Sequence, residues 1–200
     1  HDLIGIDYFQ TFAGRGLLKS KPQADAHDGK QNVYGKVLTL DEAIEAPFND
    51  PNDPTIYAPI ERDIAEHKVR KGRAIFCQTP GVFEAGNGLI GLQGSLLEMA
   101  MQPEKLMVLY RKIAEWCTSY IDNILERGVD VVHFSDDWGQ NNRMLFSPKM
   151  WWKIVYETLK ISTHHAGNAV HILAYGIATG DPQIVLAAAA VRRAKHAQVR

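Results

Sequence analysis

The sequence predicts an α/β protein of the (β/α)8 TIM-barrel type in which only part of the barrel is present. Short apolar segments alternate with longer amphipathic ones along the chain, an order that gives parallel strands joined by right-handed helical crossovers. The expected helices are long relative to the strands, which suits an outer ring around a barrel. A complete barrel needs about 250 residues and eight strands, whereas the 200 residues contain four or five strand-like segments. We therefore expect one incomplete barrel domain over residues 1–200.

The composition of the chain argues against some classes of partner and favours one cellular location. The formal net charge is −1, so no basic stripe is available for a nucleic-acid partner. No apolar run is long enough to span a bilayer, and the start lacks a signal-peptide pattern, so no membrane partner is expected. Cys77 and Cys117 form no CxxC motif, which favours a reducing cytoplasmic location over a disulfide framework. A chain that opens at His1 without Met is expected to be processed or a piece of something longer.

The N-terminal half begins with a strand over residues 2–9 that places Asp7 near its exit. Residues 14–36 are rich in glycine and charge without a helical period, which predicts a loop or small hairpin. Thr39 then caps a short helix, because Glu42 follows it three residues later in a capping box. Pro51 and Pro54 end this helix, and residues 56–70 form a second one.

The middle of the chain continues the alternation. Residues 73–80 are a strand with Gln78 near its exit. Residues 83–88 hold several glycines and are predicted to form a loop that carries Glu84. Helices follow over residues 89–101 and 103–127; Pro103 occupies the favoured first turn of the second, and Gly128 ends it.

Residues 129–139 carry the strongest functional signal. A β-branched strand ends abruptly in Asp136, Asp137, Trp138 and Gly139. Burying both carboxylates would be costly, so they belong where the strand leaves the sheet, which is where ligands and catalytic groups gather in α/β proteins. Adjacent residues point to opposite sides, so one carboxylate should face the mouth and suit proton transfer. The alternative is an ordinary turn with a helix cap.

The C-terminal part starts with a helix from Ser147-Pro148 to about residue 165, with serine as cap and proline in the first turn. Residues 168–176 read as the next strand and carry His171. An Ala-rich helix with a basic end is expected from residue 181, so residues 174–200 form a divergent helical tail.

The stretch FSDDWGQ at residues 134–140, followed by MLFSPKMW at 144–151, resembles the uroporphyrinogen decarboxylase (URO-D) superfamily. That superfamily includes the decarboxylase itself and corrinoid-dependent methyltransferases that pass methyl groups to thiols. Its pattern is an Asp-Asp-x-Gly turn, a short spacer, then Ser-Pro and an amphipathic helix. The likeness spans roughly residues 1–171 and is most specific at 128–151. It implies a (β/α)8 barrel with the active site at the carboxyl mouth of the strands.

Two motifs of the family are incomplete in this sequence, and their absence ranks the possible functions. Decarboxylases carry an Arg-x-x-x-Arg loop near the N-terminus, and only Arg15 lies in the comparable region here. The methyltransferase branch implies a zinc site that begins with His-x-Cys, and this chain offers His171 without the cysteine, so the zinc set is incomplete. We favour the corrinoid/thiol methyltransferase-like branch, with decarboxylation in porphyrin biosynthesis as the alternative. A third possibility, from another class, is a non-catalytic truncated barrel that associates with another chain through open sheet edges, as in a homo-oligomer.

The candidate site residues follow from these placements. Catalysis is assigned to Asp136 or Asp137, and the ligand is a small molecule or a tetrapyrrole or corrinoid-linked substrate. Trp138 would form an apolar wall for a planar ligand, with core packing as the alternative. Arg143 would hold a carboxylate bidentately, with a surface charge as the alternative. The expected substrate contacts are Asp7, Gln78, Glu84, Trp138, Arg143 and His171, of which His171 is also the only zinc candidate besides a remote Cys77.

Overall fold

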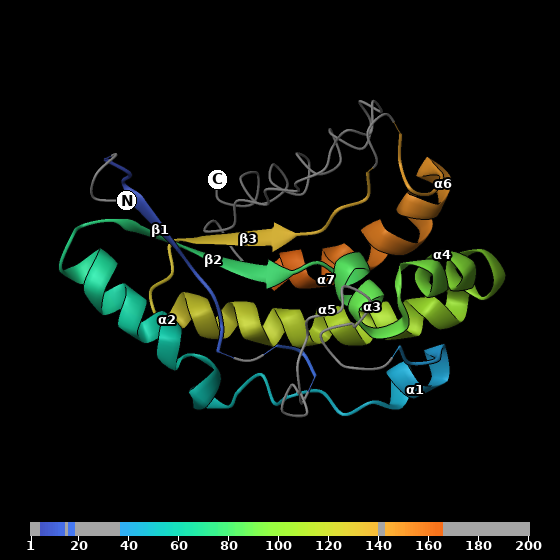
Figure 1. Cartoon of the computed structure of the whole chain (residues 1–200), viewed down its shortest axis with the longest axis horizontal. Helices are drawn as coiled ribbons and strands as arrows, with labels where there is room; N and C mark the ends of the chain where they lie inside the picture. The colour runs from blue at the N-terminus through green and yellow to red at the C-terminus, as the bar shows by residue number, and fades with distance from the viewer. Residues whose placement is uncertain (1–4, 15, 19–36, 140–142, 166–200) are drawn as a thin grey trace, which may run out of the picture.

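The computed structural model describes residues 5–14, 16–18, 37–139 and 143–165, and within them three parallel strands form one sheet. The strands are β1 (Tyr8–Thr11), β2 (Ala74–Pro80) and β3 (Val131–Ser135), in the order β1-β2-β3. Helical segments separate each strand from the next (Figure 1). The predicted alternation of parallel strands and helical crossovers is confirmed.

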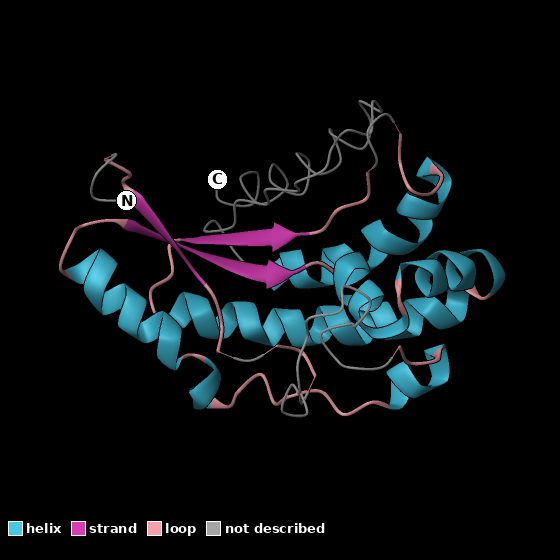
Figure 2. Ribbon diagram, viewed as in Figure 1, coloured by secondary structure: helices cyan, strands magenta, loops and turns pink. Residues whose placement is uncertain are grey.

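The sheet has one covered and one open face. Alternate residues of β2 and β3 that point to the covered face, such as Ile75 and Val132, are fully buried. Residues between them, including Gln78 and His133, are half-buried. Helices α2, α5 and α7 lie on one side of the sheet (Figures 1 and 2). Because helices surround the outside of a barrel, the open face corresponds to the barrel interior.

Two helical stretches connect β1 to β2. Helix α1 (Leu40–Glu45) begins with the predicted capping box: the Thr39 backbone N–H donates to Glu42 Oε2 at 2.7 Å, and the Glu42 N–H donates to Thr39 Oγ1 at 3.2 Å. The second stretch consists of a 3-10 turn (η1, Pro54–Ile56), α2 (Ala58–Asp63) and a π-helical turn (η2, Ile64–Val69). This agrees with the helix predicted over residues 56–70.

The prediction of a glycine-rich loop over residues 83–88 is wrong, because this stretch lies inside helix α3 (Val82–Ile90). Tight packing explains the glycine at position 86: a Cβ there would lie 2.6 Å from the Tyr110 ring. Helices α4 (Leu92–Met101) and α5 (Pro103–Glu126) follow as expected. Gly128 has a φ of +97°, which accounts for a glycine directly after α5.

Strand boundaries differ from expectation at the N-terminus. The first strand begins at Tyr8 instead of residue 2. Four or five strands were expected, and the described residues form three. The strand predicted at 168–176, with His171, and the helical tail lie outside the described residues, as does most of the expected loop at 14–36.

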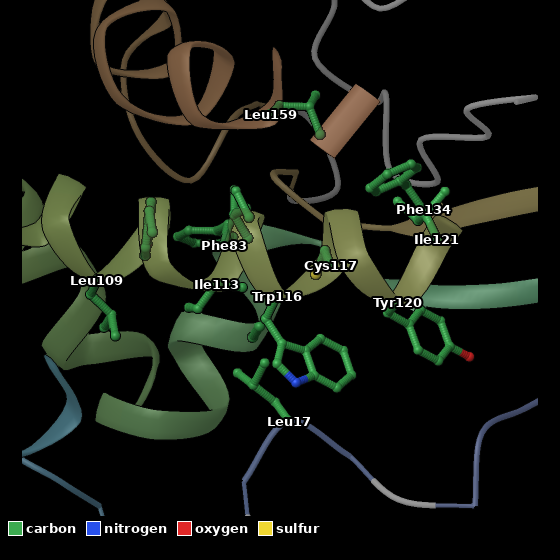
Figure 3. Packing of buried hydrophobic residues seen from close by; sticks show 14 of the residues in the cluster. Leu17, Phe83, Leu109, Ile113, Trp116, Cys117, Tyr120, Ile121, Phe134 and Leu159 are labelled. Atoms are coloured by element: carbon green, nitrogen blue, oxygen red, sulfur yellow. The ribbon is translucent and has the colours of Figure 1, made fainter. Parts of the chain in front are cut away.

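The core is built along α5, whose buried face includes Leu109, Ile113, Trp116, Cys117 and Tyr120 (Figure 3). After β3 the chain forms α6 (Pro148–Met150), a π-helical turn η3 (Trp151–Tyr156) and α7 (Glu157–His165). This continuous stretch confirms the helix predicted from Ser147. Among the described residues, no helix combines the length and the apolar character that crossing a membrane requires.

Candidate functional site

Asp136 lies at the end of β3 and caps helix α3. Its carboxyl accepts the backbone N–H of Glu84 at 2.8 Å and that of Phe83 at 3.4 Å, and the residue is 2% exposed. Burial raises the pKa of Asp136 to about 7, although the Glu84 amide opposes the shift. Gly81 allows this approach, since a Cβ there would lie 2.1 Å from Asp136 Cγ. The carboxyl therefore points into the protein beneath α3, where it accepts hydrogen bonds from the start of that helix.

Asp137 and Trp138 point in opposite directions from the same turn. Asp137 is exposed, and its Oδ1 accepts the Gly139 N–H at 2.9 Å, which closes a local turn. Trp138 is 1% exposed and packs edge-to-face on Trp151 with ring centroids 5.2 Å apart. The structure therefore places Trp138 in the core, as in the packing alternative. The catalytic roles of Asp136 and Asp137 stay predictions.

A cavity of about 420 Å³ opens where β1, β2 and β3 end and α3 begins. Its polar lining comes from Gln78, Glu84 and Ser135, and Ser135 Oγ donates to Glu84 Oε2 at 3.0 Å. The structure thus brings together two predicted contacts, Gln78 and Glu84, at the carboxyl ends of the strands. Glu84 reaches the cavity from the first turn of α3, where the partial positive charge of the helix start favours a carboxylate.

Another part of the cavity wall is apolar and aromatic. It is formed by Phe12 after β1 and by Trp116 and Tyr120 of α5, whose rings stack at 5.3 Å. Asn49 fixes this wall: its Nδ2 donates to the Gly16 carbonyl at 2.6 Å. The backbone carbonyl of Asn49 in turn accepts the Trp116 Nε1–H at 2.7 Å. The segment after β1 is therefore tied directly to α5.

Polar residues continue from the cavity along the open face of the sheet. Gln10 Nε2 donates to Gln78 Oε1 at 3.0 Å, and Gln78 is paired in register with His133. Burial lowers the pKa of His133, while the nearby Glu84 carboxylate acts in the opposite direction. His133 is half-buried on the face that leads to the cavity.

The remaining predicted contacts do not line this cavity. Asp7 comes directly before β1 and is exposed, so the prediction that it lies at a strand exit is wrong; the strand starts where it was expected to end. Arg143 is exposed in the connection between β3 and α6. His171 lies outside the described residues. Cys77, considered a remote metal ligand, lies inside β2 and faces the helices, with its Sγ 3.2 Å from the Tyr120 hydroxyl.

Several residues that line the cavity were not predicted from the sequence. Ser135 was passed over for the acids beside it, although it ends the strand that they follow. Phe12 lies between the strand predicted over residues 2–9 and the loop predicted over 14–36, and no structure was predicted for it. Trp116 and Tyr120 fit the apolar period of α5 and carry no separate signal. Alternation along β2 and β3 was the usable signal, because it places residues 78, 133 and 135 on one face.

Comparison with known proteins gives a family and a fold. Residues 82–192, more than half of the chain, match the model of the family described as uroporphyrinogen decarboxylase (URO-D). Among solved structures, a methyltransferase from Methanosarcina mazei is similar with a TM-score of 0.55 and 16% identity. That match covers 82% of this chain and 44% of the methyltransferase, so the chain spans less than half of that protein's length. A search of curated proteins found no match. The fold is therefore an incomplete TIM-barrel type.

Proposed function

Because the chain belongs to the uroporphyrinogen decarboxylase family, we propose that it forms the substrate-binding part of a barrel enzyme of the corrinoid/thiol methyltransferase-like branch. In that branch a methyl group passes between a corrinoid and a thiol. The cavity at the carboxyl ends of β1, β2 and β3 would hold the small-molecule partner, with Gln78, Glu84 and Ser135 as its polar contacts. A cytoplasmic location belongs to the same proposal, since Cys77 and Cys117 are free thiols.

The charge of the cavity is the observation that carries this choice of branch. Uroporphyrinogen bears many carboxylates, and carboxylates are held by Arg or Lys side chains. Among the described residues, the cavity lining contains no Lys, Arg or His, and Glu84 would repel a carboxylate. Arg15, between the lining residues Gly14 and Gly16, lies outside the described residues. The lining therefore favours a substrate other than a polycarboxylate.

Zinc does not fit the described residues. No group of three or more His, Cys, Asp or Glu side chains in the described ranges could hold a metal ion. Burial raises the pKa of Cys77 to about 11 and that of Cys117 to about 12, whereas zinc binds the thiolate. The zinc candidate from the sequence, His171, stays a prediction. The proposal accordingly assigns binding and orientation of substrate to the described residues.

A thiol-dependent demethylation assay tests the proposal. The chain, mixed with methylcobalamin and a small thiol, should lower the methylcobalamin absorbance faster than protein-free solution, and Glu84→Gln should slow that rate. A parallel arm supplies uroporphyrinogen and measures coproporphyrinogen. Formation of coproporphyrinogen without demethylation would replace the proposal by the decarboxylase alternative. No change in either arm would reject both activities for this chain.

The open edges of the sheet favour a second candidate function, the non-catalytic truncated barrel that associates with another chain. Within the described residues, β1 and β3 each have a single neighbouring strand, and exposed strand edges seek partners. A non-catalytic chain that pairs with a second copy would then use these edges. Light scattering on purified protein tests this candidate: a concentration-dependent dimer supports it, and a monomer over the whole range opposes it.

A further inference from the structure

We propose that the cavity binds a small organic cation with apolar substituents, and that Glu84 supplies the opposite charge. The inference deepens the proposed function, on which it rests for the identification of this cavity as the substrate pocket. It adds the chemical class of the ligand, which neither the family nor the structural likeness specifies.

The first argument is the placement of one carboxylate. Glu84 is the only Asp or Glu of the described lining. The Ser135 hydroxyl donates to it at 3.0 Å, and its backbone N–H is held at 2.8 Å by Asp136 beneath α3. Glu84 lies in the first turn of α3. The carboxylate is therefore fixed in place before any ligand arrives, which lowers the cost of ordering it on binding.

The second argument is the apolar part of the cavity wall. Phe12, Trp116 and Tyr120 line it. The Tyr120 ring stacks between Trp116 and Tyr57, so Phe12, which is 55% exposed, is the lining ring whose negative face can attract an alkylated ammonium group. Asn49 ties the segment after β1, at Gly16, to Trp116, so the Trp116 ring is held in place. A carboxylate combined with aromatic side chains matches a cation that has methyl or methylene groups, and it matches neither an anion nor a plain hydrocarbon.

The size of the cavity agrees with a small ligand. Its volume of about 420 Å³ lies near the lower end of the ~300–1,000 Å³ typical of small-molecule sites. Gln78 adds an amide beside the carboxylate, and the Gln10 amide holds its Oε1 at 3.0 Å. The site therefore offers one charge, one oriented amide and an apolar body.

Two probes of the same shape test the charge requirement. Choline and its uncharged carbon analogue 3,3-dimethyl-1-butanol would each be titrated into the 200-residue chain and followed by NMR or calorimetry. We expect choline to bind at least roughly tenfold more tightly than the analogue. Equal affinities, or no saturable binding of choline, would overturn the inference. This comparison uses the unaltered chain, so it stands even if a variant fails to fold.

Variants then assign the charge to one side chain. Glu84→Gln should reduce choline binding to the level of the uncharged analogue. Glu115→Gln is the matched control: Glu115 is exposed on α5 beside Trp116 and does not line the cavity, so its loss should leave the ratio unchanged. Equal effects of the two substitutions would contradict the assignment to Glu84.

A third measurement uses an anion, because Arg15 lies in the sequence between the lining residues Gly14 and Gly16. Succinate is expected to bind more weakly than choline. Tighter binding of succinate that Arg15→Gln abolishes would overturn the inference in favour of an anion site. All three arms measure occupancy of the cavity and not methyl transfer. A chain that binds choline but does not demethylate methylcobalamin would therefore reject the proposed reaction and leave the ligand class standing.

Discussion

Replacing Gly81 by alanine should be among the most damaging single changes in this chain. The added methyl carbon would lie 2.1 Å from Asp136 Cγ and 2.5 Å from its Oδ1. Asp136 cannot move aside freely, because it is 2% exposed and accepts two backbone N–H groups at the start of α3. Overpacking of a buried site costs about 1–3 kcal/mol, and a lost helix cap adds about 1 kcal/mol. We expect Gly81→Ala to lower the free energy of unfolding by about 2–4 kcal/mol.

Urea unfolding followed by far-UV circular dichroism measures this change. Gly94→Ala in α4 is the matched control, because a Cβ there would have no neighbour closer than 3.6 Å. It should raise the free energy of unfolding by up to about 1 kcal/mol, the usual gain of alanine over glycine in a helix. A Gly81→Ala variant within 0.5 kcal/mol or so of the wild type, about the scatter of neutral substitutions, would refute the reasoning.

A double variant identifies the clash as the cause. The methyl carbon would also lie 2.2 Å from Asp136 Cβ, so Asp136→Ala leaves the collision in place, whereas Asp136→Gly removes it. Gly81→Ala should therefore be far less harmful in the Asp136→Gly background than in the wild type. Additive effects of the two substitutions would show that the two positions do not interact.

Three further predictions follow from the same structure. Burial raises the pKa of Asp136 from 3.8 to about 7, so between these values the unfolded chain has released a proton that the folded chain keeps, and stability should fall as pH rises. Asp136→Asn should flatten that pH dependence in urea titrations, and an unchanged slope would point to another group. Thr39→Ala removes the α1 capping box and should cost about 1 kcal/mol in thermal unfolding, whereas Thr39→Ser should restore most of it. Cys77 and Cys117 are buried with raised thiol pKa values, so a thiol reagent should label them only after denaturation; rapid labelling of the native chain would contradict their burial.

Local signals predicted much of the fold. The capping box at Thr39 and the Ser147-Pro148 start rely on contacts between residues three or four apart. Such contacts are fully specified by neighbouring residues, so their helices were placed correctly. The β-branched run ending at Ser135 was equally clear.

Helix α3 could not be predicted in this way. Its glycines suggested a loop, but Gly86 makes room for the Tyr110 ring and Gly81 makes room for Asp136. Both partners are distant in sequence. The cap on α3 comes from another strand, so the stretch itself shows no capping residue.

The sequence indicated where the candidate site lies better than it indicated which side chains line it. The carboxyl end of β3 was predicted to be the edge where the functional groups gather, and two of the predicted contacts, Gln78 and Glu84, line a cavity there. Which of several neighbouring acids reaches the cavity depended on the direction of each side chain. Asp136 turns under α3, whereas Glu84 reaches the cavity from α3.

The stacked rings of Trp116 and Tyr120 give the cavity an optical reporter of its own. The indole lines the cavity, packs against Tyr120 at 5.3 Å and donates its N–H to Asn49. A ligand that enters would change the polarity around one tryptophan whose position is already fixed. Trp138, Trp151 and Trp152 form a separate aromatic group around η3 and do not line the cavity. A shift in intrinsic fluorescence that disappears in Trp116→Phe would thus register occupancy without any attached dye.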